Sequence, residues 1–289
     1  MTKRARLRAL VTLKQGLVVP GAYDGVSVRL VERAGYPVVY MTGYGTSASR
    51  LGLPDMAFAG LGEMVDHARN LAAAVGIPLI ADADTGYGNA LAVRRTVRLY
   101  ESAGVAALHL EDQVAPKRCG HLTGHQVIAL AEFEGKIRAA VEARTDPDLL
   151  IIARTDAISA AGFDEALRRG EAAARAGADV LFIEAPRTEE QIERVAREFD
   201  TPLLFNHAAG GRSPLLPFSR LRALGYAIIL LPVDTLLAAA KAIDTYLCEL
   251  RATDDTRALA DRTMAFADFN ELIGVAEQLR LAERYAVGG

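Results

Sequence analysis

Short apolar runs recur along the chain, and each of them leads into polar or charged residues. The runs predict eight strands, near residues 17–22, 38–42, 77–82, 107–111, 149–154, 180–184, 202–206 and 227–231. Residues 77–80 lead into Asp82 and Asp84, for example, and residues 180–183 lead into Glu184. Because a buried strand should not end in charge unless that end meets water, a metal or a substrate, the pattern indicates one site shared by the strand ends.

The segments between these strands have helical periodicity, and four of them close on a glycine just before the next strand. The four glycine-ended motifs cover residues 32–35, 101–104, 174–177 and 222–225. Glycine suits the left-handed turn that ends a helix, and repeated helix–glycine–strand units imply a parallel sheet. We therefore expect an α/β fold, a (β/α)8 TIM barrel over residues 1–250. Residues 251–289 are expected to form a helical extension of the same domain.

A doubly wound sheet is the rival fold, but it would require a glycine-rich phosphate loop after the first strand. Residues 21–25 match that loop weakly, because the third glycine is missing. A barrel typically uses about 250 residues as one domain, which suits a chain of 289 residues. The composition and length thus agree with the barrel.

Composition narrows the class of protein further. A hydrophobic content of 51% allows a large core, and a net charge of −3 gives no reason to expect nucleic acid or an anionic membrane as a partner. No apolar stretch approaches the roughly 20 residues of a membrane span. The basic start at residues 1–6 lacks the apolar region of a signal peptide, and two cysteines make no disulfide framework. We expect a cytoplasmic protein.

Three carboxylates should converge at the rim of the barrel. Asp82 and Asp84 alternate at one strand end, where we expect them to point the same way, and Glu111 ends the next strand. Such acids repel one another unless a cation neutralises them. Mg²⁺, or Mn²⁺ in its place, is the cofactor that this oxygen-rich set predicts. The alternative is that the acids form structural ion pairs with arginine or lysine.

A second cluster lies in the long segment after the fourth strand, where the sequence runs Lys117-Arg118-Cys119-Gly120-His121. A thiol beside two cations and an imidazole has a lowered pKa and can act as acid, base or nucleophile. The alternative is a small, buried, inert cysteine. Cys248, which lies on an apolar helix, is expected in the core.

Arg154 follows four apolar residues, and its planar guanidinium suits a carboxylate partner. Residues 42–45 offer backbone N–H groups for an anion, or else form only a tight turn. Glu184 and Asn206 complete the ring of polar strand ends. Four histidines receive weaker assignments: His121 and His207 could be structural, and His67 and His125 are expected at the surface.

These residues together resemble the isocitrate lyase/phosphoenolpyruvate mutase superfamily over nearly the whole chain. The string from Lys117 to His121, preceded by Glu111-Asp112-Gln113, is the most specific element of the resemblance. The other matching segments are residues 43–49 with 51–55, 82–86, 153–156 and 184–186, and Asn206 with the glycine pair at 210–211.

The resemblance implies a Mg²⁺ site, a substrate pocket and an acid catalyst. Asp82 would bind Mg²⁺ directly, with Asp84, Glu111 and Asp55 acting through water. A 2-oxo or 2-hydroxy acid would be held by Tyr40, Thr42, Gly43, Tyr44 and Arg154. Cys119 would be the general acid, supported by Lys117, Arg118 and His121, while Glu184 and Asn206 would contact substrate or orient the site.

The implied reaction is cleavage of the C2–C3 bond of a 2-hydroxy di- or tricarboxylic acid, such as 2-methylisocitrate or an alkylmalate. The products would be pyruvate or glyoxylate and a second carboxylic acid. The resemblance also implies a homotetramer in which the last helix is swapped between subunits.

Three alternatives stay open: a phosphonomutase of the carboxyphosphonoenolpyruvate type, an oxaloacetate-cleaving hydrolase or decarboxylase, and a barrel without catalytic activity. Two departures bear on the choice of substrate. Ala209 stands where many relatives have Glu, and Asp234 stands where relatives often have Ser or Thr. An additional acid in the pocket would repel a second substrate carboxylate, unless it lies away from the pocket.

Overall fold

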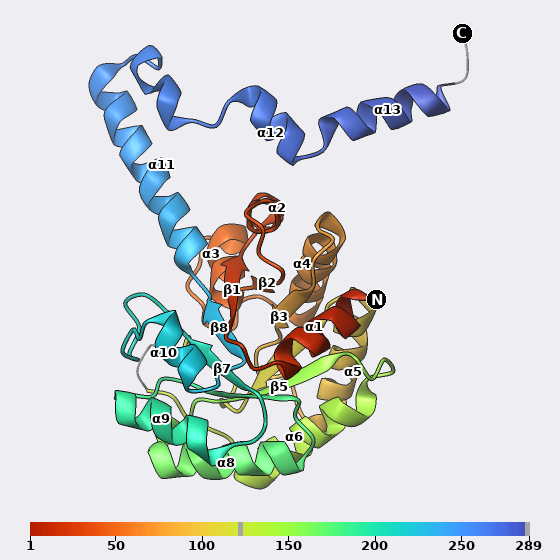
Figure 1. The fold of residues 1–289 in the computed structure, drawn as a ribbon, viewed down its shortest axis with the longest axis vertical. Helices are drawn as coiled ribbons and strands as arrows, with labels where there is room; N and C mark the ends of the chain where they lie inside the picture. The colour runs from red at the N-terminus through yellow and green to blue at the C-terminus, as the bar shows by residue number, and fades with distance from the viewer. Residues whose placement is uncertain (121–123, 287–289) are drawn as a thin grey trace.

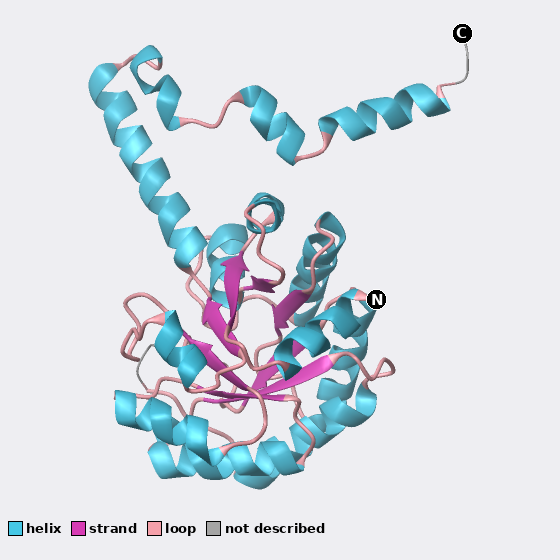
Figure 2. Cartoon of the chain, viewed as in Figure 1, coloured by secondary structure: helices cyan, strands magenta, loops and turns pink. Residues whose placement is uncertain are grey.

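The chain forms a closed barrel of eight parallel strands that follow one another in sequence order, as predicted. The computed structural model describes residues 1–120 and 124–286. Helices surround the barrel, and strand β1 closes the ring by pairing with β8 (Figures 1 and 2). Each strand begins and ends within two residues of its predicted bounds: β1 (Leu17–Ala22), β2 (Val39–Met41), β3 (Leu79–Asp82), β4 (Ala107–Glu111), β5 (Leu150–Thr155), β6 (Val180–Ile183), β7 (Leu203–Asn206) and β8 (Ile228–Leu231).

The helices of the barrel lie between these strands, and the glycines of the repeated motif end four of them. Gly35, Gly104, Gly177 and Gly225 have φ values of 85°, 90°, 96° and 84°, in the left-handed region that glycine adopts without strain. The helices are α1 (Lys3–Thr12), α2 (Gly25–Arg33), α3 (Gly43–Leu51), α4 (Leu61–Ala74), α5 (Ala90–Ser102), α6 (Leu130–Ala143), α7 (Ala157–Ala160), α8 (Phe163–Arg175), α9 (Glu189–Glu198) and α10 (Phe218–Ala223).

Alternate residues of each strand face the inside of the barrel, where they form an apolar layer. Ile80, Ile152 and Phe182 belong to this layer, and Leu7 of helix α1 packs against it. Because side chains alternate along a strand, the residue two positions after each inward-facing apolar residue also faces inward. Asp82, two positions after the inward-facing Ile80, therefore also faces inward at one end of the barrel. By the same alternation, the polar residues that end the neighbouring strands lie at that end too.

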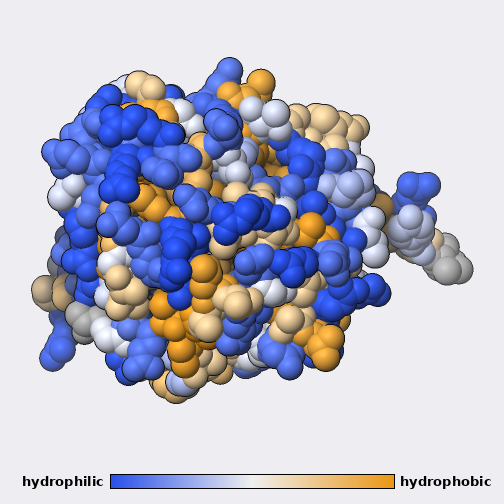
Figure 3. Space-filling view, turned by 90° about the horizontal axis from the view of Figure 1, so that it is seen from below, coloured by the Kyte–Doolittle hydropathy of each residue, from blue (hydrophilic) through white to orange (hydrophobic). Residues whose placement is uncertain are grey.

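The remaining helices leave the barrel. Helix α11 (Asp234–Thr253) projects away from β8, and it is followed by a 3₁₀ helix (Arg257–Arg262), α12 (Phe266–Leu272) and α13 (Val275–Tyr285), as Figure 1 shows. Helix α12 rests on α2, where the Arg29 guanidinium donates a hydrogen bond of 3.2 Å to the carbonyl oxygen of Leu272. The outer face that carries α6, α8 and α9 is mainly hydrophilic, with scattered apolar patches (Figure 3). Within the described residues, no helix combines the length and apolar character that a membrane crossing requires.

Candidate active site

A cavity of about 320 Å³ lies at the carboxyl ends of the strands, where the polar strand ends meet. Most of the predicted site residues line it: Tyr40, Thr42, Tyr44, Asp55, Asp82, Glu111, Lys117, Arg118, Cys119, Arg154, Glu184 and Asn206. Gly43 and Asp84 lie just behind this lining, in contact with Asp82 and Lys117 respectively. His121 falls outside the described residues. The structure therefore brings most of the predicted site residues together around one cavity.

Asp82 is held at the end of β3 by several donors. Its carboxylate accepts hydrogen bonds from the N–H of Gly43 at 3.1 Å and from the N–H of Asp84 at 2.9 Å. His109 Nε2 and the Tyr40 hydroxyl each lie 3.4 Å from a carboxylate oxygen of Asp82. Burial alone would raise the pKa of Asp82, but His109, Lys117 and the N–H of Asp84 outweigh burial and lower the pKa to about 2. Asp82 is thus ionised at neutral pH.

Lys117 bridges two of the other predicted metal ligands. Its ammonium lies 2.6 Å from Asp55 and 2.7 Å from Asp84, and its side chain is buried. Burial raises the pKa of Asp84 to about 6, although Lys117 opposes this shift. Asp84 turns toward the lysine because its own φ is 48°, in the left-handed region, and not because it alternates with Asp82 along the strand. For Asp55 and Asp84, the structure therefore contains the lysine pairing that the sequence left open as an alternative.

Carboxylates outnumber the cations around the cavity. Among the described residues there, six buried acids surround two buried cations; the acids are Asp55, Asp82, Asp84, Glu111, Asp156 and Glu184, and the cations are Lys117 and Arg154. Burial raises the pKa of Glu111 well above its usual range in spite of Arg154, and Glu111 Oε1 has no hydrogen-bond partner. Within residues 1–120 and 124–286, no three acidic, His or Cys side chains form a ready cage for a metal. The donor type and the excess negative charge nevertheless fit Mg²⁺.

Arg154 is buried among acids on the opposite wall of the cavity. Its guanidinium donates to Asp156 at 3.0 and 2.9 Å, and it lies 3.2 Å from Glu184 and 3.4 Å from Glu111. The guanidinium carbon also lies 4.9 Å from the centre of the Phe182 ring. A substrate carboxylate arriving here would meet a rigid, fully charged donor.

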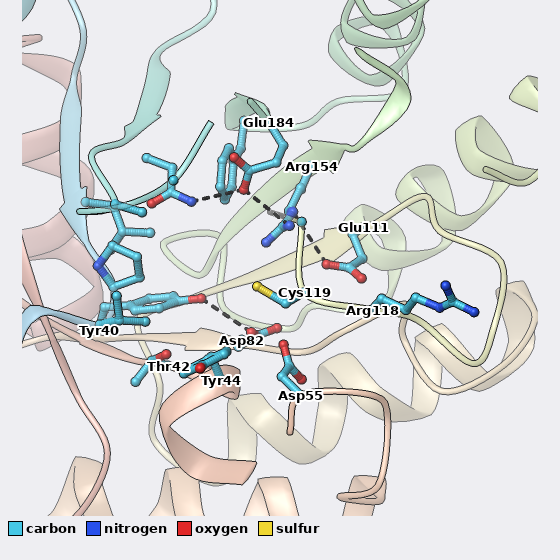
Figure 4. Close-up of a pocket in the computed structure, with 18 of the residues that line it drawn as sticks. Tyr40, Thr42, Tyr44, Asp55, Asp82, Glu111, Arg118, Cys119, Arg154 and Glu184 are labelled. Atoms are coloured by element: carbon cyan, nitrogen blue, oxygen red, sulfur yellow. Dashed lines mark hydrogen bonds and ion pairs between the residues drawn. The ribbon is translucent and has the colours of Figure 1, made fainter. Parts of the chain in front are cut away.

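The sulfur of Cys119 points into the middle of the cavity, between Tyr40, Asp82 and Arg154 (Figure 4). Its main chain is anchored on both sides, because its N–H donates to the Asp55 carbonyl at 3.2 Å and its own carbonyl lies 3.0 Å from His125 Nε2. The two expected flanking cations are placed differently. Lys117 binds carboxylates, and the guanidinium of Arg118 points away from the cavity (Figure 4).

Residues 42–45 form the start of helix α3. Thr42 is the N-cap residue, and its hydroxyl accepts from the N–H of Gly45 at 3.1 Å, while the N–H of Gly43 donates to Asp82. The exposed anion site predicted from the sequence is therefore partly occupied by the protein's own acceptors. The positive end of the helix dipole faces Asp82 and favours its charge.

Replacing Gly43 by alanine should weaken Mg²⁺ binding about tenfold or more, because a Cβ at this position would lie 2.2 Å from Asp82 Oδ2. Isothermal titration with Mg²⁺ measures the effect. Gly25→Ala is the matched control, since that Cβ meets no atom within 4 Å at the start of α2. Equal Mg²⁺ affinity in the two variants would contradict the prediction that Asp82, against which Gly43 packs, binds the metal.

Sequence reasoning missed two residues of the site and misplaced others. His109 lies buried with Nε2 2.7 Å from the Tyr40 hydroxyl, and burial lowers its pKa to about 4. The sequence could have indicated His109, because it lies two residues before Glu111 on the same strand and both side chains face inward. His67 and His125 were expected at the surface but are buried, where each contacts a main-chain carbonyl. Asp156, which binds Arg154, was also missed.

Two further residues with sequence-based expectations, Cys248 and Asp234, lie away from the cavity. Cys248 was expected in the core and is exposed, because α11 leaves the barrel. Asp234 lines a separate hollow between α2 and α11, so it does not add an acid to the cavity at the strand ends. Ala209 does line the cavity.

Comparison with known proteins points to one group of enzymes. A family model described as phosphoenolpyruvate phosphomutase matches residues 7–251. The chain is 45% identical over 288 residues to 2,3-dimethylmalate lyase of Eubacterium barkeri, with 100% of both chains covered.

Solved structures agree with this match. Oxaloacetate acetylhydrolase in complex with 3,3-difluorooxalacetate has a TM-score of 0.92 and 38% identity, covering 98% of this chain and 96% of that chain. Phosphonopyruvate hydrolase in complex with oxalate and Mg²⁺ has a TM-score of 0.90 and 31% identity, covering 99% of each chain.

Proposed function

The chain belongs to the phosphoenolpyruvate mutase/isocitrate lyase superfamily of lyases and mutases, and from that premise we propose that it is a Mg²⁺-dependent carbon–carbon lyase. Its substrate would be a 2-hydroxy dicarboxylic acid, cleaved at C2–C3 to a 2-oxo acid and a second carboxylic acid. The observation that carries the proposal is the Cys119 sulfur in the middle of the cavity, facing both the acid cluster and Arg154 (Figure 4). A thiol placed there can protonate a carbanion.

The remaining wall of the cavity favours an alkyl-substituted dicarboxylate over a tricarboxylate. It is apolar, made of Ala208, Ala209, Leu230, Pro232, Val233 and Leu237. A further carboxylate buried against such a wall would need a cation. Among the described lining residues the cations are Lys117, which binds acids, Arg118, which points away, and Arg154. An alkylmalate, whose alkyl group would meet this wall, fits best.

The metal would be held by Asp82, with Asp84, Glu111 and Asp55 contributing through water. A bound divalent cation would supply Lewis-acid polarisation of the substrate's 2-oxygen. Release of Asp55 and Asp84 from Lys117 would then free carboxylate oxygens for the metal's water ligands. The unpartnered oxygen of Glu111 supports the same assignment.

The protein's own groups would carry the rest of the reaction. Arg154, the Tyr40 hydroxyl and the N–H of Tyr44 would bind and orient the 2-oxo acid half of the substrate. A carboxylate of the acid cluster would take the proton of the 2-hydroxyl as the C2–C3 bond breaks, the 2-oxo group forms, and the electron pair of that bond moves to C3 as an enolate-like carbanion. The thiol of Cys119 would give its proton to that carbon, and Glu184 and Asn206, joined at 3.0 Å, would orient the site.

The first experiment is to measure 2-oxo acid release with Mg²⁺, coupled to a reductase, across alkylmalates including 2,3-dimethylmalate, 2-methylisocitrate, isocitrate and oxaloacetate. We expect the highest kcat/KM with an alkylmalate. Preference for a tricarboxylate would contradict the substrate class, and conversion of oxaloacetate to oxalate and acetate, followed separately as oxalate formation, would favour the hydrolase alternative. If none of these acids released a 2-oxo acid and phosphonopyruvate were turned over, the result would favour a phosphonomutase over a lyase.

We also propose that the C-terminal helices are exchanged between the subunits of a homotetramer. No residue of α11, all of which is described, is buried, and Leu237, Ile243 and Leu247 are 46%, 59% and 55% exposed. An apolar hollow of about 420 Å³ lies between α2 and α11, lined by Pro20, Leu30, Val31, Leu231 and Ala239 among others. An unpartnered apolar helix face beside such a hollow is typical of an interface between copies.

Light scattering tests the assembly directly. The wild-type chain should have the mass of four subunits, and Ile243→Asp should reduce that mass, because it buries a charge in the proposed interface. A monomer of the wild-type chain would contradict the proposal.

A further inference from the structure

A buried chain of charged side chains runs from the cavity to an outer helix, and the proposed reaction does not use its far end. Arg154 lies in the cavity and donates two hydrogen bonds to Asp156. Asp112, which is 0% exposed, accepts the N–H of Asp156 at 2.9 Å and the Thr155 hydroxyl at 2.6 Å. Arg169 of α8 then donates to Asp112 at 2.9 Å.

Unpaired charges are costly to bury. Each charged side chain of this series is therefore paired with the next, and the pairing fixes their relative positions. Burial and the neighbouring Asp156 raise the pKa of Asp112, and Arg169 counteracts this by favouring the ionised form. An ionised Asp112 accepts hydrogen bonds with both oxygens. Its two oxygens accept the two contacts that fix residues 155 and 156.

The backbone at Asp156 explains why these contacts matter. Asp156 follows the last residue of β5, with φ −97° and ψ 15°, and it precedes α7 without a side-chain cap. Its carboxylate can therefore accept the hydrogen bonds of Arg154 while Asp112 holds its main chain. Three acids contact the Arg154 guanidinium, but Asp156 alone among them meets both Nε and Nη2 within 3.0 Å.

We infer that Arg169 and Asp112 are positioning residues for the substrate-binding arginine. They fix Asp156, and Asp156 fixes the direction of the Arg154 guanidinium in the cavity. This inference rests on the proposed function in so far as Arg154 binds a 2-oxo acid. Arg169 itself is only 5% exposed. Its other nitrogens donate hydrogen bonds to Glu165 and to the carbonyl oxygen of Ile128, so its side chain is held in one position.

The test is the affinity of Arg169→Met and Asp112→Asn for oxalate, measured by calorimetry at saturating Mg²⁺. We expect oxalate affinity to fall about tenfold to hundredfold, and Mg²⁺ affinity in the absence of oxalate to stay within about twofold. Arg169→Lys keeps the charge and should recover part of the oxalate affinity. Arg168→Met is the matched control, because Arg168 is the adjacent residue of α8, is 61% exposed and pairs only with Glu165 among the contacts described.

A double-mutant cycle separates positioning from general destabilisation. If Arg169 acts through Arg154, then Arg169→Met should cost little further oxalate affinity in an Arg154→Lys background. Fully additive losses, or unchanged oxalate affinity in folded Arg169→Met, would overturn the inference. Should Arg169→Met fail to fold, Asp112→Asn takes its place under the same criteria. A wild-type chain that does not bind oxalate would instead overturn the proposed function.

Discussion

Asp82→Ala should reduce Mg²⁺ affinity by at least about a hundredfold and abolish turnover. Asp82 is the carboxylate that two main-chain N–H groups fix at the end of β3, and its lowered pKa keeps it ionised. Asp84 and Glu111 are less well placed to replace it, because Asp84 pairs with Lys117 at 2.7 Å and Glu111 lies 3.4 Å from Arg154. Calorimetric titration with Mg²⁺, or with Mn²⁺ followed by electron paramagnetic resonance, measures the loss.

Asp66→Ala is the control for this substitution, since Asp66 lies on α4 with its side chain 66% exposed and contacts only Arg69 among the ion pairs described. Circular dichroism at the assay temperature confirms that the variant is folded. Mg²⁺ affinity retained in folded Asp82→Ala would refute the assignment of the direct ligand. Loss of affinity in both variants would indicate a general effect of charge.

The fold could be predicted because one local pattern, the apolar run of strand length, occurs eight times, and a second, the helix that closes on glycine, occurs four times. Apolar runs of strand length alternate with helices that close on glycine, and these rules refer only to neighbouring residues. The same alternation placed Asp82, Arg154 and Glu184 at one end of the barrel. Residues two positions apart on a strand share a face, so the polar residue after each apolar pair had to point inward.

The details that escaped prediction depend on contacts between distant segments. Lys117 reaches back across 62 residues to Asp55, and Arg169 reaches Asp112 across 57 residues. No local pattern marks such pairs. Asp84 lies just behind the cavity lining, but its backbone is left-handed and does not continue the pleat from which its direction was predicted. His109 could have been found by extending the alternation from Glu111.

Cys119→Ser should lower kcat by about 10² to 10⁴ while leaving Mg²⁺ and oxalate affinity nearly unchanged. The serine side chain is close in size, and the main-chain contacts with Asp55 and His125 do not involve the sulfur. A hydroxyl is a far weaker acid than a thiol, whose usual pKa is about 8.5, so it would protonate the carbanion slowly. The effect should therefore fall on proton transfer and not on binding.

The coupled assay for 2-oxo acid release measures kcat, and calorimetry measures the two affinities in the same preparation. Cys248→Ser is the matched control, because Cys248 is exposed on α11, outside the cavity. Unchanged turnover in Cys119→Ser would refute the general-acid role. Loss of oxalate affinity together with turnover would mean that the thiol binds substrate, because an acid that acts only after C2–C3 cleavage has no part in ground-state affinity.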